Sequence, residues 1–505
     1  SFTIPMMKEQ GVRKDFAAAI ESVASSGGQI MPPVMGVAAF LMADILGVAY
    51  VRVIQAAIIP ALLFYFSVGV AVQFAVLRYG WTTENTDGPG ILASLFSRSA
   101  LLKSLYALVV VGAFYVARAV LGLGILPAAG AALASLVVAR LLQAVVQDRR
   151  STAEDFAGAV ARFFDGTHFA IPMSVLIYTL VVMQLSPMAA GLYTTLTLIG
   201  TMVFGNPIAT LARELGGLAD ESDAGDSTAN VSIVAAIERA LYTFVGTVYR
   251  TLKGFRRGAI DMAPLVGVLA AMGVIISMLT QTGLTSEISV RMVALGGGVL
   301  LVVLILAMIT SILFGLGMPT PAAYILVATL LVSPLTDLGV TEITAHLFVF
   351  YFAMLSAITP PVAVGVAVGS RIANSGFMTA AKQAMKIGAA GFLIPYALVV
   401  NDSLVNWTLT GTPVAVFCVF VGVVALTAVT IGFDGRHVLG VSHRAAYLAL
   451  AMLAMYAPAL GGFVGGSVTM LLQVTGAAVA LAGLALAQLD RLPPAVTPAP
   501  RAGDR

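Results

Sequence analysis

Residues 345–370 read AHLFVFYFAMLSAITPPVAVGVAVGS, a hydrophobic run with two consecutive prolines near its centre. Proline has no backbone N–H and its ring clashes with the preceding helical turn, so a helix breaks there. The residue before a proline is also displaced from the helical region of backbone space. The segment therefore predicts an interrupted helix over residues 343–372, with the break at Pro360 and Pro361.

The composition of the whole chain indicates that lipid surrounds most of it. Of its 505 residues, 59% are hydrophobic and 10% are charged, and the mean hydropathy is +0.98. Soluble domains carry about 25% charged residues because their surfaces need polar cover. With about 20 residues per spanning helix, we expect an all-α integral membrane protein with about a dozen crossings.

The charge balance and the cysteine count argue against other classes. There are 27 Lys and Arg against 24 Asp and Glu, so nothing favours nucleic acid as a partner. A single cysteine rules out an internal disulfide framework. We find no catalytic motif either, so the chain is not expected to be an enzyme.

A second copy of the interrupted segment lies near the start of the chain. GVRKDFAAAIESVASSGGQIMPPVMGVA begins at Gly11, and GVTEITAHLFVFYFAMLSAITPPVAVGVA begins at Gly339. Both copies place a double proline, Pro32–Pro33 or Pro360–Pro361, 21 residues after the glycine. Interrupted segments at matching places of two repeats predict a binding site at mid-membrane depth, because broken backbone is tolerated there only inside protein or beside a water-filled cavity.

A further broken element precedes the second copy. The string GLGMPTPAAYILVATLLVSP covers residues 315–334 and follows ILAMITSILF at residues 305–314. About 14 apolar residues reach from the glycine- and proline-rich start to Pro334, which is short for a crossing. We expect a re-entrant hairpin over residues 305–334.

These segments define an expected organisation. The regions are a first repeat at 1–90; connecting helices at 91–255, with a polar loop at 206–232 and an amphipathic basic helix at 233–257; a second repeat at 256–400; C-terminal helices at 401–490; and a disordered tail at 491–505. Basic residues near positions 149, 382 and 436 predict cytoplasmic loops.

At the quoted hairpin and interrupted-helix strings, and at SFTIPMMK near the start, the chain resembles a tripartite ATP-independent periplasmic (TRAP) transporter. More narrowly, it resembles the large or fused permease of the branch that uses TAXI-type binding proteins. The resemblance covers residues 1–90 and 255–400 most clearly. It implies an elevator-type transporter with inverted repeats, located in the bacterial inner membrane.

The resemblance also implies partners and a coupling ion. A periplasmic TAXI-type binding protein would deliver a small carboxylate, either a dicarboxylate or a glutamate-like acid. A small TRAP membrane subunit, separate or fused upstream, would complete the transporter. A Na⁺ gradient would drive uptake, and no cofactor is expected.

Site residues follow from the same resemblance and from the chemistry of broken helices. The expected Na⁺ ligands are Ser26, Gly27, Gly315, Ser356 and Thr359. The expected substrate contacts are Gly317, Met318, Pro319, Thr320, Gly28, Pro32, Pro33, Pro360 and Pro361.

Two questions stay open at the level of sequence. A hairpin tip equivalent to Gly317 would fall before Ser1, so we expect the sequence to be truncated at its N-terminus. The alternatives to a TRAP permease are a stand-alone divalent-anion/Na⁺ symporter and a passive channel. An intramembrane hydrolase would need a nucleophile with a base or paired aspartates, and the sequence shows neither.

Overall fold

The computed structural model describes residues 3–81, 172–203, 229–408, 411–461 and 465–488. Contacts divide the chain into two units, one formed by residues 1–83 with 260–505 and the other by residues 84–259. Within the described residues the secondary structure is helical, apart from an isolated bridge between Phe433 and Val438. The expected all-α class is confirmed.

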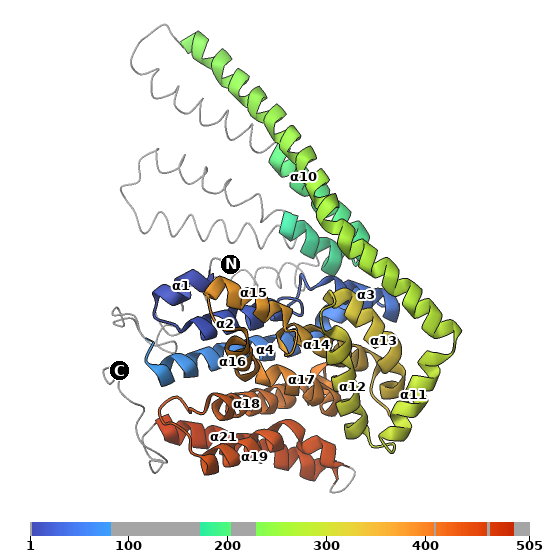
Figure 1. Cartoon of the computed structure of the whole chain (residues 1–505), viewed down its shortest axis with the longest axis vertical. Helices are drawn as coiled ribbons and strands as arrows, with labels where there is room; N and C mark the ends of the chain where they lie inside the picture. The colour runs from blue at the N-terminus through green and yellow to red at the C-terminus, as the bar shows by residue number, and fades with distance from the viewer. Residues whose placement is uncertain (1–2, 82–171, 204–228, 409–410, 462–464, 489–505) are drawn as a thin grey trace, which may run out of the picture. The chain divides into compact units, whose positions relative to one another are not determined.

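The larger unit carries both interrupted segments (Figure 1). Its helices are α1 (Thr3–Glu9), α2 (Lys14–Gly27), α3 (Val37–Leu46), α4 (Tyr50–Tyr79), α11 (Leu284–Leu295), α12 (Leu300–Gly315), α13 (Thr320–Asp337), α14 (Glu342–Leu355), η3 (Ser356–Ile358), α15 (Val364–Ala373), α16 (Phe377–Ile387), α17 (Ala389–Val400), η4 (Asp402–Leu404), α18 (Gly411–Ile431), α19 (Val441–Tyr456), η5 (Ala457–Leu460) and α21 (Gly466–Gln488). The smaller unit contains helices at Pro172–Val182, which ends in the π-helical turn η2 (Tyr178–Val182), and at Pro187–Val203. Helix α10 (Ala229–Gln281) has residues in both units.

Several helices are long and apolar enough to cross a membrane. Among the described residues these are Tyr50–Tyr79, Leu241–Gln281, Thr320–Asp337, Phe377–Val400, Gly411–Ile431 and Gly466–Ala487. Helix α12 exposes Leu301, Ile305, Ile309 and Leu313 at intervals of four residues, which forms one continuous apolar stripe. Such a stripe suits lipid and not water.

The structure repeats as the sequence predicts. Helices α2 and α14 each have 14 residues, and α3 and α15 each have 10. Gly11 and Gly339, which precede the two copies, adopt φ values of +81° and +90°. The peptide bonds Pro32–Pro33 and Pro360–Pro361 are both cis.

The two copies pack crosswise. Helix α2 of the first copy contacts α15 of the second, and α14 of the second contacts α3 of the first. The contact of α2 with α15 is much more extensive than that of α14 with α3, so the pairing is unequal. It brings the first break (residues 28–36) and the second break (residues 356–363) into the same unit (Figure 1).

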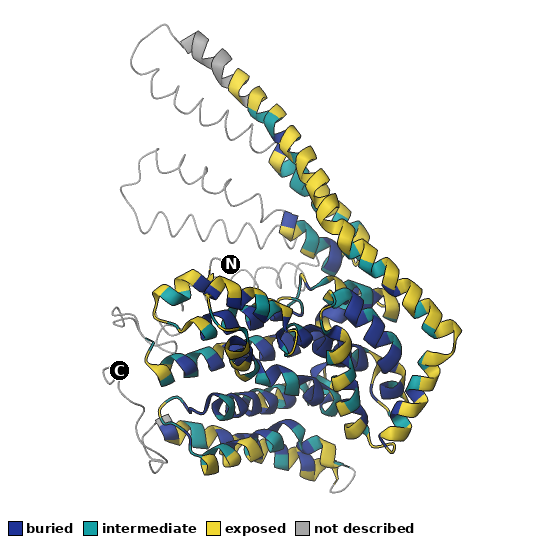
Figure 2. Cartoon of the chain, viewed as in Figure 1, coloured by how far each residue is buried: buried dark blue, intermediate teal, exposed yellow. Residues whose placement is uncertain are grey.

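Helix α14 forms the centre of this arrangement. Its residues are buried from Thr344 to Leu355 on all sides, whereas α11 and the outer face of α12 are largely exposed (Figure 2). A helix that is apolar all round is stable when other elements surround it. The chain therefore places the break after α14 inside protein, where interrupted backbone is tolerated.

Two expected boundaries differ from the structure. The basic helix expected at 233–257 continues without a break into the expected crossing after it, as α10. Helix α13 passes through Pro334 to Asp337, where packing of the buried proline against neighbouring helices offsets the one backbone hydrogen bond that it removes. Helix α13 is thus long enough to span, contrary to the estimate of a 14-residue arm.

Some expectations concern residues outside the described part of the chain. These are the connecting helices over 91–171, most of the polar loop at 206–232, and the tail at 491–505. Of the expected loop, residues 229–232 form the first turn of α10.

Candidate functional site

The first break follows the carboxyl end of α2. The Ser26 hydroxyl donates to the Ser22 carbonyl oxygen at 2.8 Å, one turn earlier. Gly27, the last residue of the helix, has no room for a side chain because the Phe64 ring lies where a Cβ would stand. The Tyr50 hydroxyl closes the far side of the break by donating to the Pro33 carbonyl oxygen at 3.1 Å.

The second break has similar hydroxyl chemistry. The Thr359 hydroxyl donates to the Leu355 carbonyl oxygen at 2.8 Å. The Ser356 hydroxyl lies 2.6 Å from the Ala353 carbonyl oxygen and 2.9 Å from the Gly315 carbonyl oxygen. A hydroxyl has one proton and two lone pairs, so both hydroxyls keep acceptor capacity for a cation.

The hairpin tip, residues 316–319, lies against the second break. A Cβ on Gly315 would stand 2.7 Å from the Ser356 Cβ, so only glycine fits at the end of α12. Gly317 adopts a φ of +78°, and a Cβ there would lie 3.9 Å from Val362 Cγ1. Thr320 then begins α13 without a side-chain cap.

The two breaks are joined by small residues on α2 and α15. The Ser22 hydroxyl donates to the Gly365 carbonyl oxygen at 3.1 Å, across 343 positions of sequence. A Cβ on Gly369 would meet Ser22 Oγ at 2.7 Å, and one on Gly365 would lie 3.8 Å from Ser26 Oγ. Small residues at four-residue spacing on both helices allow this close approach.

A cavity of about 390 Å³ opens where these helices cross. We call it the serine cavity; its lining consists of Ile4, Glu21, Ser22, Ser25, Ser26, Gln29, Ala357, Gly365, Val368, Gly369 and Ile372. Glu21 is its only charged side chain, and it accepts hydrogen bonds from the hydroxyls of Thr3 and Ser25. The lining is therefore rich in oxygen atoms, which are the ligands that hard cations prefer.

The two copies differ in residue size at the serine positions. The double prolines are 328 positions apart, and the residues 328 positions after Ser22 and Ser26 are Phe350 and Met354. Both are fully buried. Helix α14 therefore carries large side chains where α2 carries small hydroxyls, so the side chains differ although the helix lengths repeat.

The amino ends of α3, α13 and α15 provide a different kind of site. None of the three helices has a side-chain cap that bonds its first N–H groups. Uncapped N–H groups and the positive end of the helix dipole favour an anion. The loops that precede α13 and α15 approach each other, since a Cβ on Gly317 would lie 3.9 Å from Val362 Cγ1. The geometry thus offers oxygen ligands for a cation and N–H donors for a carboxylate.

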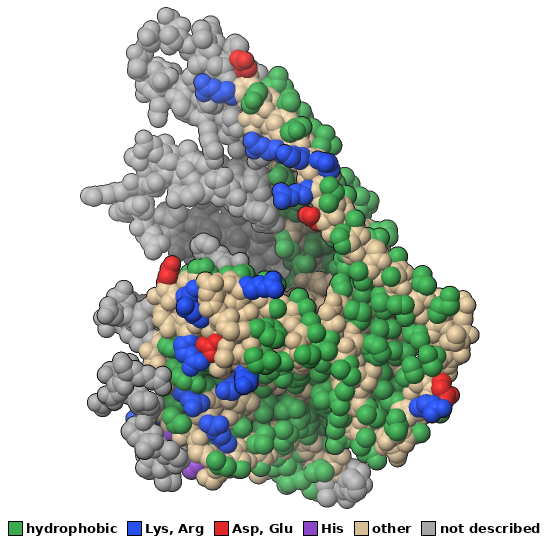
Figure 3. Space-filling view, viewed as in Figure 1, with side chains coloured by type: hydrophobic (Ala, Val, Ile, Leu, Met, Phe, Trp, Pro, Cys, Tyr) green, Lys and Arg blue, Asp and Glu red, His purple; other side chains and the backbone are tan. Residues whose placement is uncertain are grey.

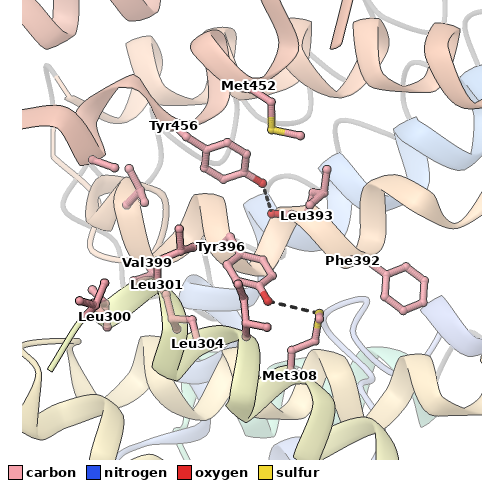
Figure 4. Close-up of a pocket in the computed structure, with 14 residues that line it drawn as sticks. Leu300, Leu301, Leu304, Met308, Phe392, Leu393, Tyr396, Val399, Met452 and Tyr456 are labelled. Carbon is pink, nitrogen blue, oxygen red and sulfur yellow. Dashed lines mark hydrogen bonds between the residues drawn. The ribbon is translucent and has the colours of Figure 1, made fainter. Parts of the chain in front are cut away.

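A larger cavity, of about 940 Å³, has the wrong chemistry for a carboxylate or a sodium ion. It lies between α12, α17, α19 and η5 and is almost wholly apolar (Figure 4). The Tyr456 hydroxyl donates to the Leu393 carbonyl oxygen at 2.7 Å, and the Tyr396 hydroxyl lies 3.2 Å from Met308 Sδ (Figure 4). Both polar groups already have partners, and no charged side chain lines the cavity.

The structure brings together part of the predicted residue set. Gly315 contacts Ser356, and Ser26 lies in the serine cavity with residues of the second copy. The carboxyl end of α2 holds Ser26 and Gly27. The first break contains Gly28, Pro32 and Pro33, and the second contains Pro360 and Pro361. The hairpin tip consists of Gly317, Met318 and Pro319 together with Leu316. Their roles in binding Na⁺ and substrate stay predictions.

Sequence reasoning missed most of the serine cavity. Glu21, Ser22, Gln29, Gly365 and Gly369 were not among the predicted residues, although all five line it. The repeated spacing of small residues on both sides of the breaks is the signal that points to them.

His346, a plausible proton carrier by its position in an apolar helix, has a structural partner. Its Nδ1 lies 2.7 Å from the Tyr324 hydroxyl oxygen, and both side chains are buried between α13 and α14. Neither residue lines the serine cavity.

The chain has been compared with known proteins. A family model described as "Tripartite ATP-independent periplasmic transporter, DctM component" matches residues 1–213 and 226–413. No curated protein and no solved structure matches. The matched residues include both breaks, the hairpin and the serine cavity.

Proposed function

Because the chain belongs to the family of DctM components of tripartite ATP-independent periplasmic transporters, we propose that it is the permease for a small organic acid, driven by a Na⁺ gradient. The observation that carries this proposal is the meeting of two repeated helix breaks at one oxygen-lined cavity. Membership of the family implies a periplasmic binding protein and a small membrane subunit as partners.

The chemistry of the breaks supports Na⁺ as the coupling ion. Ser26, Ser356 and Thr359 each donate to a carbonyl of the preceding turn and keep lone pairs available. Glu21 adds a negative charge beside Ser26. We infer a first Na⁺ site at Ser26 and Gly27 and a second at Gly315, Ser356 and Thr359.

A carboxylate is proposed at the hairpin tip. Helices α13 and α15 begin without side-chain caps, and the loops that precede them approach each other at Gly317 and Val362. Gly317, Met318, Pro319 and Thr320 would contact one end of the substrate, since exposed N–H groups bind carboxylates without a cationic side chain. A dicarboxylate and a glutamate-like acid both carry such a group.

The binding protein is proposed to be of the TAXI type, and the membrane to be the bacterial inner membrane. The transport movement is proposed to be of the elevator type, in which the unit with both breaks moves as a whole. A stand-alone divalent-anion/Na⁺ symporter would share the breaks but would need no binding protein. A passive channel would share the cavity but would need no gradient.

Uptake by cells that express the permease together with a small membrane subunit and a periplasmic binding protein tests the proposal. We expect labelled dicarboxylate or glutamate to accumulate only with the binding protein present and only with an inward Na⁺ gradient. Accumulation without the binding protein would favour the symporter, and equilibration without a gradient would favour the channel.

A further inference from the structure

Two arginines converge at the carboxyl end of α18, far along the chain from both breaks. Arg78, in the last turn of α4, donates to the Ile431 carbonyl oxygen. Arg444, in the first turn of α19, donates through Nε to the Leu439 carbonyl oxygen at 3.1 Å. Both guanidinium groups border the space where a Cβ on Gly432 would stand, and Arg78 Nη1 is 2.9 Å from it.

The two guanidinium groups bring two positive charges close together at the carboxyl end of α18, whose dipole offsets only part of that charge. Among the described residues neither is paired with a carboxylate, and each uses few of its five N–H donors. Asp434 is the single carboxylate of residues 431–444, and it accepts hydrogen bonds from the backbone N–H groups of Arg436 and His437. An anion that accepts hydrogen bonds from both free forks would relieve their repulsion.

An apolar groove lies between α4, α18 and α21, near this cluster. It has a volume of about 280 Å³ and is lined by Phe74, Phe420, Val424, Leu481 and Leu484, among others. Phe74 lies one helical turn before Arg78 on α4, so the groove and the guanidinium share one helix face. Asp434 also lines the groove, two residues before Arg436 in the same turn.

Aromatic rings mark the depth of the cluster. Tyr79 and Trp81 stack with ring centroids 5.0 Å apart directly after Arg78, and tyrosine and tryptophan gather at membrane–water interfaces. Lysine and arginine side chains also gather toward one end of the larger unit (Figure 3). Such an excess marks the cytoplasmic side, whose leaflet is rich in anionic lipid.

We propose that this place binds one anionic phospholipid, with its phosphate on Arg78 and Arg444 and an acyl chain in the groove lined by Phe74 and Phe420. A charged cluster alone would suit any phosphate. The adjoining apolar groove selects the lipid, because a soluble anion has nothing to place in it. The site is independent of the proposed transport site, since none of its residues lines the serine cavity.

The fluorescence of Trp81 can report lipid binding near Arg78, which lies three residues earlier in the chain. The chain has two tryptophans, so Trp407→Phe leaves Trp81 as the sole reporter. The protein is reconstituted in phosphatidylcholine vesicles. In one series an increasing fraction of the lipid is brominated phosphatidylglycerol, and in the other it is brominated phosphatidylcholine. Brominated acyl chains quench tryptophan fluorescence on contact. We expect phosphatidylglycerol to quench Trp81 at a lower mole fraction than phosphatidylcholine does.

Variants separate the headgroup from the groove. Arg78→Gln with Arg444→Gln should raise the half-quenching fraction of phosphatidylglycerol about thirtyfold, whereas Arg78→Lys with Arg444→Lys should retain most of the preference. Ala485→Phe, which fills the groove without a change of charge, should reduce quenching as well. Arg291→Gln is the control, because Arg291 pairs with Glu287 elsewhere.

Equal quenching by the two lipids in the parent protein would overturn the proposal. An unchanged preference for phosphatidylglycerol in the double variant Arg78→Gln with Arg444→Gln would overturn it too. Unchanged quenching in Ala485→Phe would leave only a headgroup contact and overturn the acyl-chain assignment. If the double variant Arg78→Gln with Arg444→Gln fails to fold, the double variant with lysine at both positions and Ala485→Phe still decide between these outcomes.

Discussion

The contact between Gly315 and Ser356 is the point where hairpin packing and the proposed ion site depend on the same atoms. In Gly315→Ala, the new Cβ would lie 2.5 Å from Ser356 Oγ and 2.7 Å from Ser356 Cβ. Real Cβ atoms do not approach this closely, so α12 must move away from the second break. That movement lengthens the 2.9 Å hydrogen bond from the Ser356 hydroxyl to the Gly315 carbonyl oxygen.

The magnitude follows from these two effects. Overpacking by one methyl group in a tight contact costs about 1–3 kcal/mol. Weakening one hydrogen bond adds about 0.5–1.5 kcal/mol. We therefore expect Gly315→Ala to lower the apparent melting temperature by several degrees. Displacing one of the proposed oxygen ligands should also raise the half-activating Na⁺ concentration about tenfold, equivalent to about 1.4 kcal/mol.

The assay measures Na⁺-dependent uptake and Na⁺-dependent thermal stabilisation, with choline as the replacement cation. Gly69→Ala is the matched control, because Gly69 lies within α4 and a Cβ there meets nothing within 4 Å. Alanine favours a helix interior by about 0.5–1 kcal/mol, so this variant should be as stable as the parent or slightly more so.

A double variant separates packing from ion binding. Ser356→Gly removes the side chain that Gly315→Ala would strike, so the pair should regain stability. It should not regain Na⁺ affinity, because the hydroxyl is gone. A Gly315→Ala variant with the parent's melting temperature and the parent's Na⁺ dependence would refute the reasoning.

Three other substitutions test neighbouring contacts. Thr359→Ala should weaken Na⁺ activation of uptake while melting changes little, because its hydroxyl bonds only the Leu355 carbonyl oxygen one turn back; unchanged activation in both Thr359→Ala and Ser356→Ala contradicts the second Na⁺ site. Gly369→Ala should destabilise the protein by about 1–3 kcal/mol in thermal melts, since its Cβ would stand 2.7 Å from Ser22 Oγ. Gly273→Ala is the control, because a Cβ at this position of α10 meets nothing within 4 Å. Equal stability of the two variants counts against the close approach of α2 and α15. Glu21→Gln removes the only charge of the serine cavity and should raise the half-activating Na⁺ concentration severalfold; an unchanged value removes Glu21 from the first Na⁺ site.

The sequence predicts the repeated breaks well, because proline acts locally. A double proline ends a helix whatever surrounds it, and the glycines at 11 and 339 mark the turn before each copy. Both features lie within short strings. The helix bounds around them agree between the copies for the same reason.

The serine cavity could not be read in the same way, because it depends on contacts between distant residues. Ser22 and Gly365 are 343 positions apart, and only the packing of α2 on α15 brings them together. The helix through Pro334 was missed because the packing that buries α13 around this residue overrides the local preference of proline. The expected boundary within α10 rested on a change from basic to apolar residues, which does not by itself end a helix.

We have proposed that two repeated breaks form one Na⁺-coupled site for a carboxylate. The most direct test is the uptake of labelled dicarboxylate and glutamate by the permease with its small subunit and binding protein, with and without a Na⁺ gradient. We predict concentrative uptake that collapses when choline replaces Na⁺ and that shifts to higher Na⁺ concentration in Ser356→Ala. Concentrative uptake of the same acid that ignores Na⁺ in both proteins would contradict it.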